Sequence, residues 1–150
     1  MGTHHEGSEE EIRGLDAFIK LTRAANTVTT RLARKLAEVE LTASQFGILE
    51  TLLHLGPLCQ KELGEKLLTT GGNITTIVDN LERRELVKRV RSEEDRRFVA
   101  VHLTEEGRRY IGRIFPRHMR HIVESMQVLS PDELEELSRL CKKLGRGQPE

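Results

Sequence analysis

The 150-residue sequence is poor in several residue types, and each shortage excludes a class of protein. There is no Trp, and aromatic residues make up 3% of the chain, so a core must be built from aliphatic side chains. The two cysteines, Cys59 and Cys141, are far apart, which excludes a disulfide framework and is typical of a reducing cytoplasm. No apolar run approaches the roughly 18 residues of a membrane span, and the N-terminus has no signal-peptide core. We therefore expect a cytoplasmic protein that does not contact a membrane.

The formal net charge is zero, because 24 basic residues balance 24 acidic ones. The overall composition, with 37% hydrophobic and 32% charged residues, predicts one globular domain. The basic residues nevertheless gather in one stretch, where residues 83–97 contain seven Lys or Arg against four acids. Nucleic-acid affinity depends on such a local basic surface rather than on the total charge.

The stretch 63–103 contains the strongest pattern in the chain. A helical segment over residues 59–68 is followed by a turn at 69–72 and a second helical segment over residues 71–84. In the second segment, apolar residues recur at helical spacing, at Ile74, Ile77, Val78 and Leu81. The opposite face has small polar side chains, which suit a DNA major groove, and Thr70 is a candidate N-cap. We expect base-edge or nearby backbone contacts from Gly72, Asn73, Thr75, Thr76 and Asn80.

Two short runs rich in β-branched residues follow this helix. They cover residues 86–91 and 98–103 and enclose the charged loop SEEDRR at 92–97. A helix-turn-helix followed by a β-hairpin is a winged helix, whose loop can approach the minor groove, where Arg is favoured. We expect Arg83, Arg84 and Lys88 to contact phosphates and Arg96 to enter the groove beside the wing.

Long helical patterns lie on both sides of this stretch. Residues 9–38 form one stripe of apolar residues, and residues 41–55 form a shorter helix capped by Thr42. Thr104 and Ser130 are candidate N-caps of two further helices, of which the first should kink or split at Pro116 and the second should end at Gly145. The first stripe is too long for so small a domain to bury, so we expect a second subunit to cover it.

The segments NITTIVDNLERRELVKR, SEEDRR and VHLTEEG, in this order and spacing, resemble the MarR family of bacterial transcriptional regulators. The resemblance extends over about residues 15–144. It implies a mainly α fold with a small β-hairpin wing, in which residues 41–103 form the winged helix-turn-helix core. Residues 9–40 and 104–145 would form the dimerisation lobe of a single domain over 9–150, preceded by a disordered N-terminus at 1–8. The implied function is a repressor that binds a palindromic operator as a homodimer.

Asp79 is an exception on the polar face of the predicted DNA-reading helix, because an unpaired carboxylate would repel phosphates. It therefore needs a cationic partner. The resemblance suggests Arg97, reaching back from the wing, while Asp95 would hold the loop. In the alternative, Asp79 is solvated and Arg97 is free to contact DNA.

The resemblance also implies a small anionic or aromatic effector, bound between the dimerisation lobe and the winged core. Candidate lining residues are Phe18, Arg23, His54 and Arg113. The competing interpretation is that the arginine row at 109, 113, 117 and 120 is a solvated or DNA-approaching face.

Two alternative functions remain open at this stage. One is an oxidant sensor acting through Cys59, which lies near Lys61, although the first helix lacks the cysteine that some relatives use. The other is a winged-helix protein-interaction module without DNA function.

His118 and His121 lack the further ligands of a metal site, and the sequence contains no nucleotide-binding or hydrolase motif. We expect neither a cofactor nor an enzyme.

Overall fold

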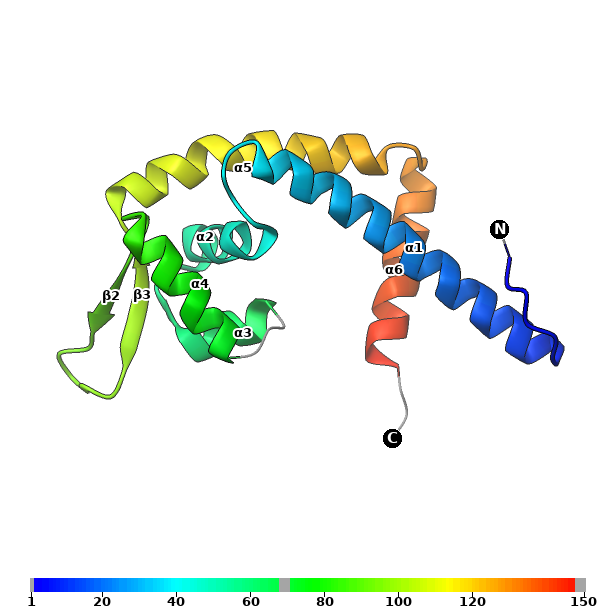
Figure 1. Ribbon diagram of the computed structural model, residues 1–150, viewed down its shortest axis with the longest axis horizontal. Helices are drawn as coiled ribbons and strands as arrows, with labels where there is room; N and C mark the ends of the chain where they lie inside the picture. The colour runs from blue at the N-terminus through cyan, green and yellow to red at the C-terminus, as the bar shows by residue number, and fades with distance from the viewer. Residues whose placement is uncertain (1, 68–70, 148–150) are drawn as a thin grey trace.

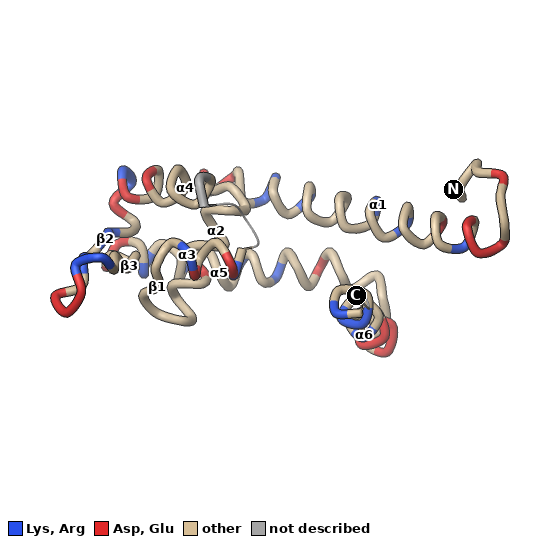
Figure 2. The backbone as a smooth tube through the Cα atoms, turned by 90° about the horizontal axis from the view of Figure 1, so that it is seen from below, with Lys and Arg blue, Asp and Glu red and all other residues tan. Residues whose placement is uncertain are grey.

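The computed structural model describes residues 2–67 and 71–147, which form a mainly helical chain with one small sheet (Figure 1). The elements follow in the order α1 (Glu9–Ala37), α2 (Ala43–Leu55), β1 (Leu58–Cys59), α3 (Gln60–Leu67), α4 (Gly71–Arg83), β2 (Val87–Arg91), β3 (Val99–Leu103), α5 (Glu105–Met126) and α6 (Pro131–Arg146). Helix α5 runs along one side of a compact winged core, while most of α1 and the C-terminal helix α6 extend away from that core (Figures 1 and 2). The predicted mainly α fold with a β-hairpin wing is confirmed.

Four helices begin at a side-chain cap. The hydroxyls of Ser8, Thr42, Thr104 and Ser130 each accept a hydrogen bond from the backbone N–H three residues later. Such a bond satisfies one of the amides that a helix start leaves unpaired. The predicted caps of α2, α5 and α6 are therefore correct, and Ser8 adds one that was not predicted.

Helices α1 and α4 end in the same kind of turn. At the end of α1, the N–H of Leu41 donates to the carbonyl of Leu36, and at the end of α4 the N–H of Leu86 donates to that of Leu81. These are Schellman motifs, whose penultimate residue adopts a left-handed conformation that favours Gly. Here the residues are Glu40 and Glu85, with φ of 58° and 61°.

The start of α5 packs directly on the turn that ends α4. The Thr104 hydroxyl donates to the carbonyl of Glu85 at 2.6 Å, and the Thr104 N–H donates to the carbonyl of Leu86 at 3.1 Å. A Cβ added to Gly107 would lie 1.9 Å from the same Leu86 oxygen, so only glycine permits this approach. The winged core and α5 are thereby joined through backbone atoms.

Four details differ from the sequence-based expectations. A two-residue strand, β1, was not predicted, and it pairs with β3 to give an antiparallel sheet of order β1-β3-β2. Gly71 and Gly72, which were expected to belong to the turn at 69–72, are part of α4. The candidate cap Thr70 lies outside the described residues. Pro116 does not split α5, which continues as one helix to Met126 and packs against α1 and α2. Finally, α6 continues one residue past Gly145.

The buried residues occupy only the middle of the chain. Among the described residues, none before Leu36 or after His118 is buried. The core lies between α2, α3, α4, the sheet and the first half of α5, with Ile48, Leu49, Leu63, Ile74 and Leu81 fully enclosed. Helix α1 runs beside α5, while α6 stands away from α1, as the two perpendicular views show (Figures 1 and 2).

Candidate nucleic-acid interface

Helix α4 lies across the front of the winged core (Figure 1). One face of the helix is buried and the other is exposed. Ile74, Val78 and Leu81 are fully buried, and Ile77 is partly buried against the same core. The apolar stripe predicted from the sequence is therefore the face that anchors α4. Its opposite side remains available for a ligand.

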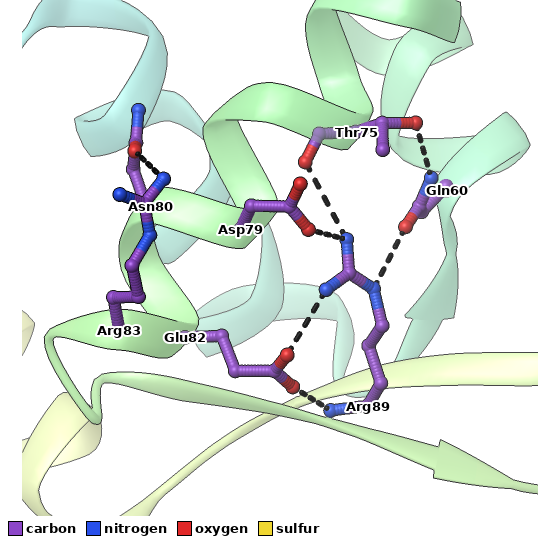
Figure 3. A network of polar contacts seen from close by, with 7 residues as sticks. All are labelled: Gln60, Thr75, Asp79, Asn80, Glu82, Arg83 and Arg89. Carbon is purple, nitrogen blue, oxygen red and sulfur yellow. Dashed lines mark hydrogen bonds and ion pairs between the residues drawn. The ribbon is translucent and has the colours of Figure 1, made fainter.

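The polar side of α4 divides into two parts. Asn73, Thr76, Asn80 and Arg83 follow one another at spacings of three and four residues, so they share one side of the helix. Thr75 and Asp79 instead face α3 and β2 (Figure 3). Arg83 donates to the Oδ1 of Asn80 at 2.6 Å, which holds an exposed cation beside an amide.

Arg89 of β2 is the centre of a polar network that braces α4 (Figure 3). Its Nη2 lies 2.7 Å from Asp79, and its Nη1 lies 3.0 Å from Glu82, whose other oxygen accepts the Arg89 N–H at 2.9 Å. The Nε donates to the Oε1 of Gln60 at 3.0 Å, and Nη2 also approaches the carbonyl of Thr75 at 3.4 Å. One guanidinium therefore neutralises the carboxylates on this side of α4.

Gln60 extends the network to α3. Its Nε2 donates to the hydroxyl of Thr75 at 3.0 Å. Thr75, one of the expected base contacts, is consequently held from its hydroxyl as well as from its carbonyl. Neither Gln60 nor Arg89 was expected from the sequence to support α4. The available signal was the pair Asp79 and Glu82, three residues apart on one helix and close in sequence to a strand containing an arginine.

The expected pairing of Asp79 with Arg97 is wrong. Arg97 instead binds Asp95 within the wing loop, through its backbone N–H and two side-chain nitrogens at 3.0–3.1 Å. The Arg97 guanidinium lowers the pKa of Asp95, and Asp95 raises the pKa of Arg97. Asp95 is only two residues from Arg97 in the sequence, which favours this pair over a pair between Arg97 and the more distant Asp79. Asp95 does hold the loop, and the Arg97 side chain remains 88% exposed at its surface.

The other cations of this region differ in their surroundings. Lys88 and Arg96 are exposed, and neither forms an ion pair with a described residue. Arg84 is half-buried and turns inward, donating to the carbonyl of Glu40 at 2.7 Å and to the Tyr110 hydroxyl at 3.1 Å. Its nitrogens are therefore engaged inside the subunit, which argues against the phosphate contact expected from the sequence.

The tip of the wing is acidic (Figure 2). Glu93 and Glu94 are exposed there, between Arg91 on one side and Arg96 and Arg97 on the other. The local cationic surface is thus interrupted at the point that extends furthest from the core. Like charges would make the tip itself repel a phosphate backbone.

The four candidate effector residues do not form one pocket within the subunit. Phe18 and Arg23 lie on α1, exposed, in the part of the chain that has no buried residues. His54 contacts the ring of Phe115, with centroids 4.9 Å apart. Arg113 lines a hollow of about 520 Å³ between the end of α1 and α5, and the other three candidates are not part of its lining. In this hollow Arg117 lies 3.5 Å from Glu38.

His118, Cys59 and Cys141 differ in how far they are buried. His118 is buried, and its Nδ1 has no hydrogen-bond partner among the described residues. Burial, with a smaller effect of His121, lowers the pKa of His118. Cys59 is half-buried at the start of α3, and its N–H donates to Glu62 at 2.8 Å, whereas Cys141 is exposed on α6. Across residues 2–67 and 71–147, no three potential metal ligands come together, and no helix is both long and apolar enough to cross a membrane.

A recognition helix braced on a three-stranded sheet, with a loop between its last two strands, defines a winged helix-turn-helix protein. Residues 41–99 match the MarR family. The chain is 34% identical to the HTH-type transcriptional regulator YkoM of Bacillus subtilis over 139 residues, which are 92% of the chain and 90% of that protein. It is 35% identical to the HTH-type transcriptional regulator MhqR of the same organism, over 89% of the chain and 92% of the relative.

Solved structures give the same result for the fold. AbsC, a MarR family regulator from Streptomyces coelicolor, superposes with a TM-score of 0.83 at 22% identity, covering 96% of this chain and all of that one. A mutant MarR from E. coli in complex with operator DNA gives a TM-score of 0.78 at 25% identity, covering 93% and 99%. The chain belongs to the MarR family of transcriptional regulators, which are not enzymes.

Proposed function

We propose that the chain binds a roughly palindromic operator as a homodimer and represses transcription from it. The observation that carries this proposal is the exposed side of α4, where Asn73, Thr76, Asn80 and Arg83 lie together while Arg89 neutralises the nearby carboxylates. Amides and hydroxyls can read base edges, and an arginine beside them can bind a phosphate. The operator complex of E. coli MarR, a structural neighbour, supports the same use of the fold.

Several of the predicted contacts are retained in this proposal. Base edges or nearby phosphates would meet Gly72, Asn73, Thr75, Thr76 and Asn80; Arg83 and Lys88 would bind phosphates; and Arg96 and Arg97 would approach the minor groove beside the wing. The Thr75 hydroxyl accepts a hydrogen bond from Gln60, so Thr75 would contribute partly by fixing α4 to α3. We omit Arg84 because its guanidinium is engaged inside the subunit.

The proposed dimer follows from the apolar surface of the terminal helices. Phe18 is 63% exposed on α1, Val123 is 54% exposed on α5, and Leu144 is 59% exposed on α6. No residue of α6 is buried, although its leucines recur at helical spacing. A second copy of the same helices would cover these surfaces by twofold symmetry and place two α4 helices about one DNA turn apart.

The proposed regulator responds to a small anionic or aromatic effector. The hollow lined by Tyr110, Arg113 and Arg117 lies between the end of α1 and α5, so a small carboxylate bound there would contact both. Phe18, Arg23 and His54 would take part only if the second subunit brings them to a common site. Binding would relieve repression by favouring a different separation of the two recognition helices.

The test combines mass and DNA binding. Sedimentation at micromolar concentration should give twice the subunit mass of 17.1 kDa. Fluorescence anisotropy with the intergenic DNA upstream of the chain's own gene should show saturable binding that weakens steeply with salt. A monomer, or a dimer with no preference for that DNA over a random duplex, would contradict the proposal and favour a protein-interaction module. Peroxide sensitivity that is lost in Cys59→Ser would instead support an oxidant sensor.

A further inference from the structure

Arg84 joins three elements at the base of the recognition helix. It follows the last residue of α4, and its guanidinium donates to the carbonyl of Glu40 and to the hydroxyl of Tyr110. The same guanidinium lies 5.6 Å from the centre of the Tyr110 ring, within the range of a cation–π contact. Tyr110 in turn donates to the carbonyl of Val39. We call Val39, Glu40, Arg84 and Tyr110 the Arg84 junction.

The acceptors in this junction are two carbonyls of the turn that directly follows α1. A helix end leaves its last carbonyls without intrahelical partners, and its partial negative charge attracts a cation. Arg84 and Tyr110 satisfy the carbonyls of Glu40 and Val39, respectively. The residue that follows the recognition helix and a tyrosine of α5 therefore both bind the turn between α1 and α2.

The junction is well placed to control the direction of α4. On its other side, the turn after α4 is fixed to α5 by Thr104 and Gly107. Helix α4 has 13 residues and is thus about 20 Å long. A rotation of about 10° around its C-terminal end would move its N-terminal end by roughly 3.5 Å, close to one base-pair step.

We propose that Arg84 is a positioning residue that sets the angle of the recognition helix relative to α1 and α5, and thereby the half-site spacing that the dimer accepts. This inference rests on the proposed function, because spacing has meaning only for a dimer on DNA. Arg84 does not contact DNA in this proposal. It acts through the backbone of the α1–α2 turn and through Tyr110.

The experiment compares operator spacings rather than a single affinity. Duplexes selected by the wild-type dimer are rebuilt with one or two base pairs inserted or removed between the half-sites, and each is titrated at several salt concentrations. Arg84→Ala removes both donated hydrogen bonds. It should reduce the preference for the wild-type spacing by at least about fivefold, the change that a net loss of one hydrogen bond would produce. Tyr110→Phe keeps the ring and removes the hydroxyl, so it should reduce the preference in the same direction even if Arg84→Ala folds poorly.

Arg83→Ala is the matched control, since Arg83 is the exposed neighbour of Arg84. It should weaken binding at every spacing alike and lower the salt dependence by about one phosphate contact. If Arg84→Ala behaves like Arg83→Ala, then Arg84 binds phosphate and the inference is wrong. If both junction variants keep the wild-type spacing preference, the inference fails while the proposed function stands. A wild-type protein that binds no duplex would overturn both.

Discussion

Asp79 and Arg89 form an ion pair between the recognition helix and the sheet, with 2.7 Å between Oδ1 and Nη2. Arg89 also binds Glu82, and its side chain is 23% exposed. A single arginine thus compensates two carboxylates on the helix proposed to approach DNA. The arrangement makes Arg89 an internal support for α4 rather than a residue of the DNA-facing surface.

A double-mutant cycle tests this pair. Asp79→Asn and Arg89→Gln should each lower the free energy of unfolding, and their effects should be coupled by about 0.5–1 kcal/mol, since the pair is partly screened by solvent. Urea unfolding of the two single variants and the double variant measures the coupling. The control cycle of Asp79→Asn with Arg97→Gln should be additive, because Arg97 binds Asp95. Coupling in the control cycle alone would restore the pairing that the sequence suggested.

Arg96 tests the contribution of the wing. Arg96→Ala should weaken operator binding and lower the slope of log affinity against log salt by about 0.9, the value for one phosphate neutralised. Arg96→Lys retains the charge and should retain most of the slope. A titration in which Arg96→Ala has the wild-type affinity and slope would remove this residue from the proposed interface.

The acidic wing tip predicts a gain of affinity on neutralisation. Glu93→Gln combined with Glu94→Gln should strengthen DNA binding by about twofold to tenfold at low salt, because it removes repulsion near the phosphate backbone. The gain should shrink as salt rises. Glu135→Gln, which changes an exposed acid on α6, serves as the control and should leave affinity unchanged. Equal affinity of the wing variant and the wild type would mean that the tip does not approach DNA.

Gly107 should be irreplaceable for a steric reason. The added methyl group of Gly107→Ala would meet the Leu86 carbonyl, so the backbone must shift at a cost of about 2–3 kcal/mol in unfolding free energy. Gly112→Ala on the same helix meets nothing within 4 Å and should stabilise the protein by up to about 1 kcal/mol. Thermal or urea unfolding distinguishes the two. Similar stability of both variants would contradict the close packing of α5 on the turn after α4.

His118 should make stability depend on pH. Burial lowers its pKa in the folded state, so the unfolded chain binds a proton more readily. Stability should therefore be complete above the ordinary histidine pKa of about 6.5 and should fall as the pH drops below it. His118→Leu should reduce this loss between pH 7.5 and 5.5, with the stability at pH 8 as the reference. An unchanged pH profile in His118→Leu would assign the dependence to other groups.

Patterns of local origin were predictable from the sequence. The stripe of Ile74, Val78 and Leu81 identified the buried side of α4, and the caps at Thr42, Thr104 and Ser130 identified helix starts. Both kinds of signal depend on residues within a few positions of each other. The two strands of the wing were also apparent from their β-branched residues.

The partners of charged side chains were not predictable in the same way. Arg84 contacts Glu40, 44 residues away, and Arg89 contacts Gln60, 29 residues away. Periodicity reports which side of an element a residue occupies, but it does not report which distant element meets that side. The family resemblance suggested Arg97 as the partner of Asp79. In the structure Arg97 binds Asp95, two residues away, and Asp79 binds Arg89.

The left-handed residues Glu40 and Glu85 have a practical consequence for protein engineering. A side chain in this conformation costs about 1 kcal/mol, a penalty that Gly does not incur. Neither position lies on the exposed side of α4 or in the wing, and Arg84 binds the main-chain oxygen of Glu40, which a substitution keeps. Glu40→Gly and Glu85→Gly should therefore raise the melting temperature without changing which DNA sequences the protein binds.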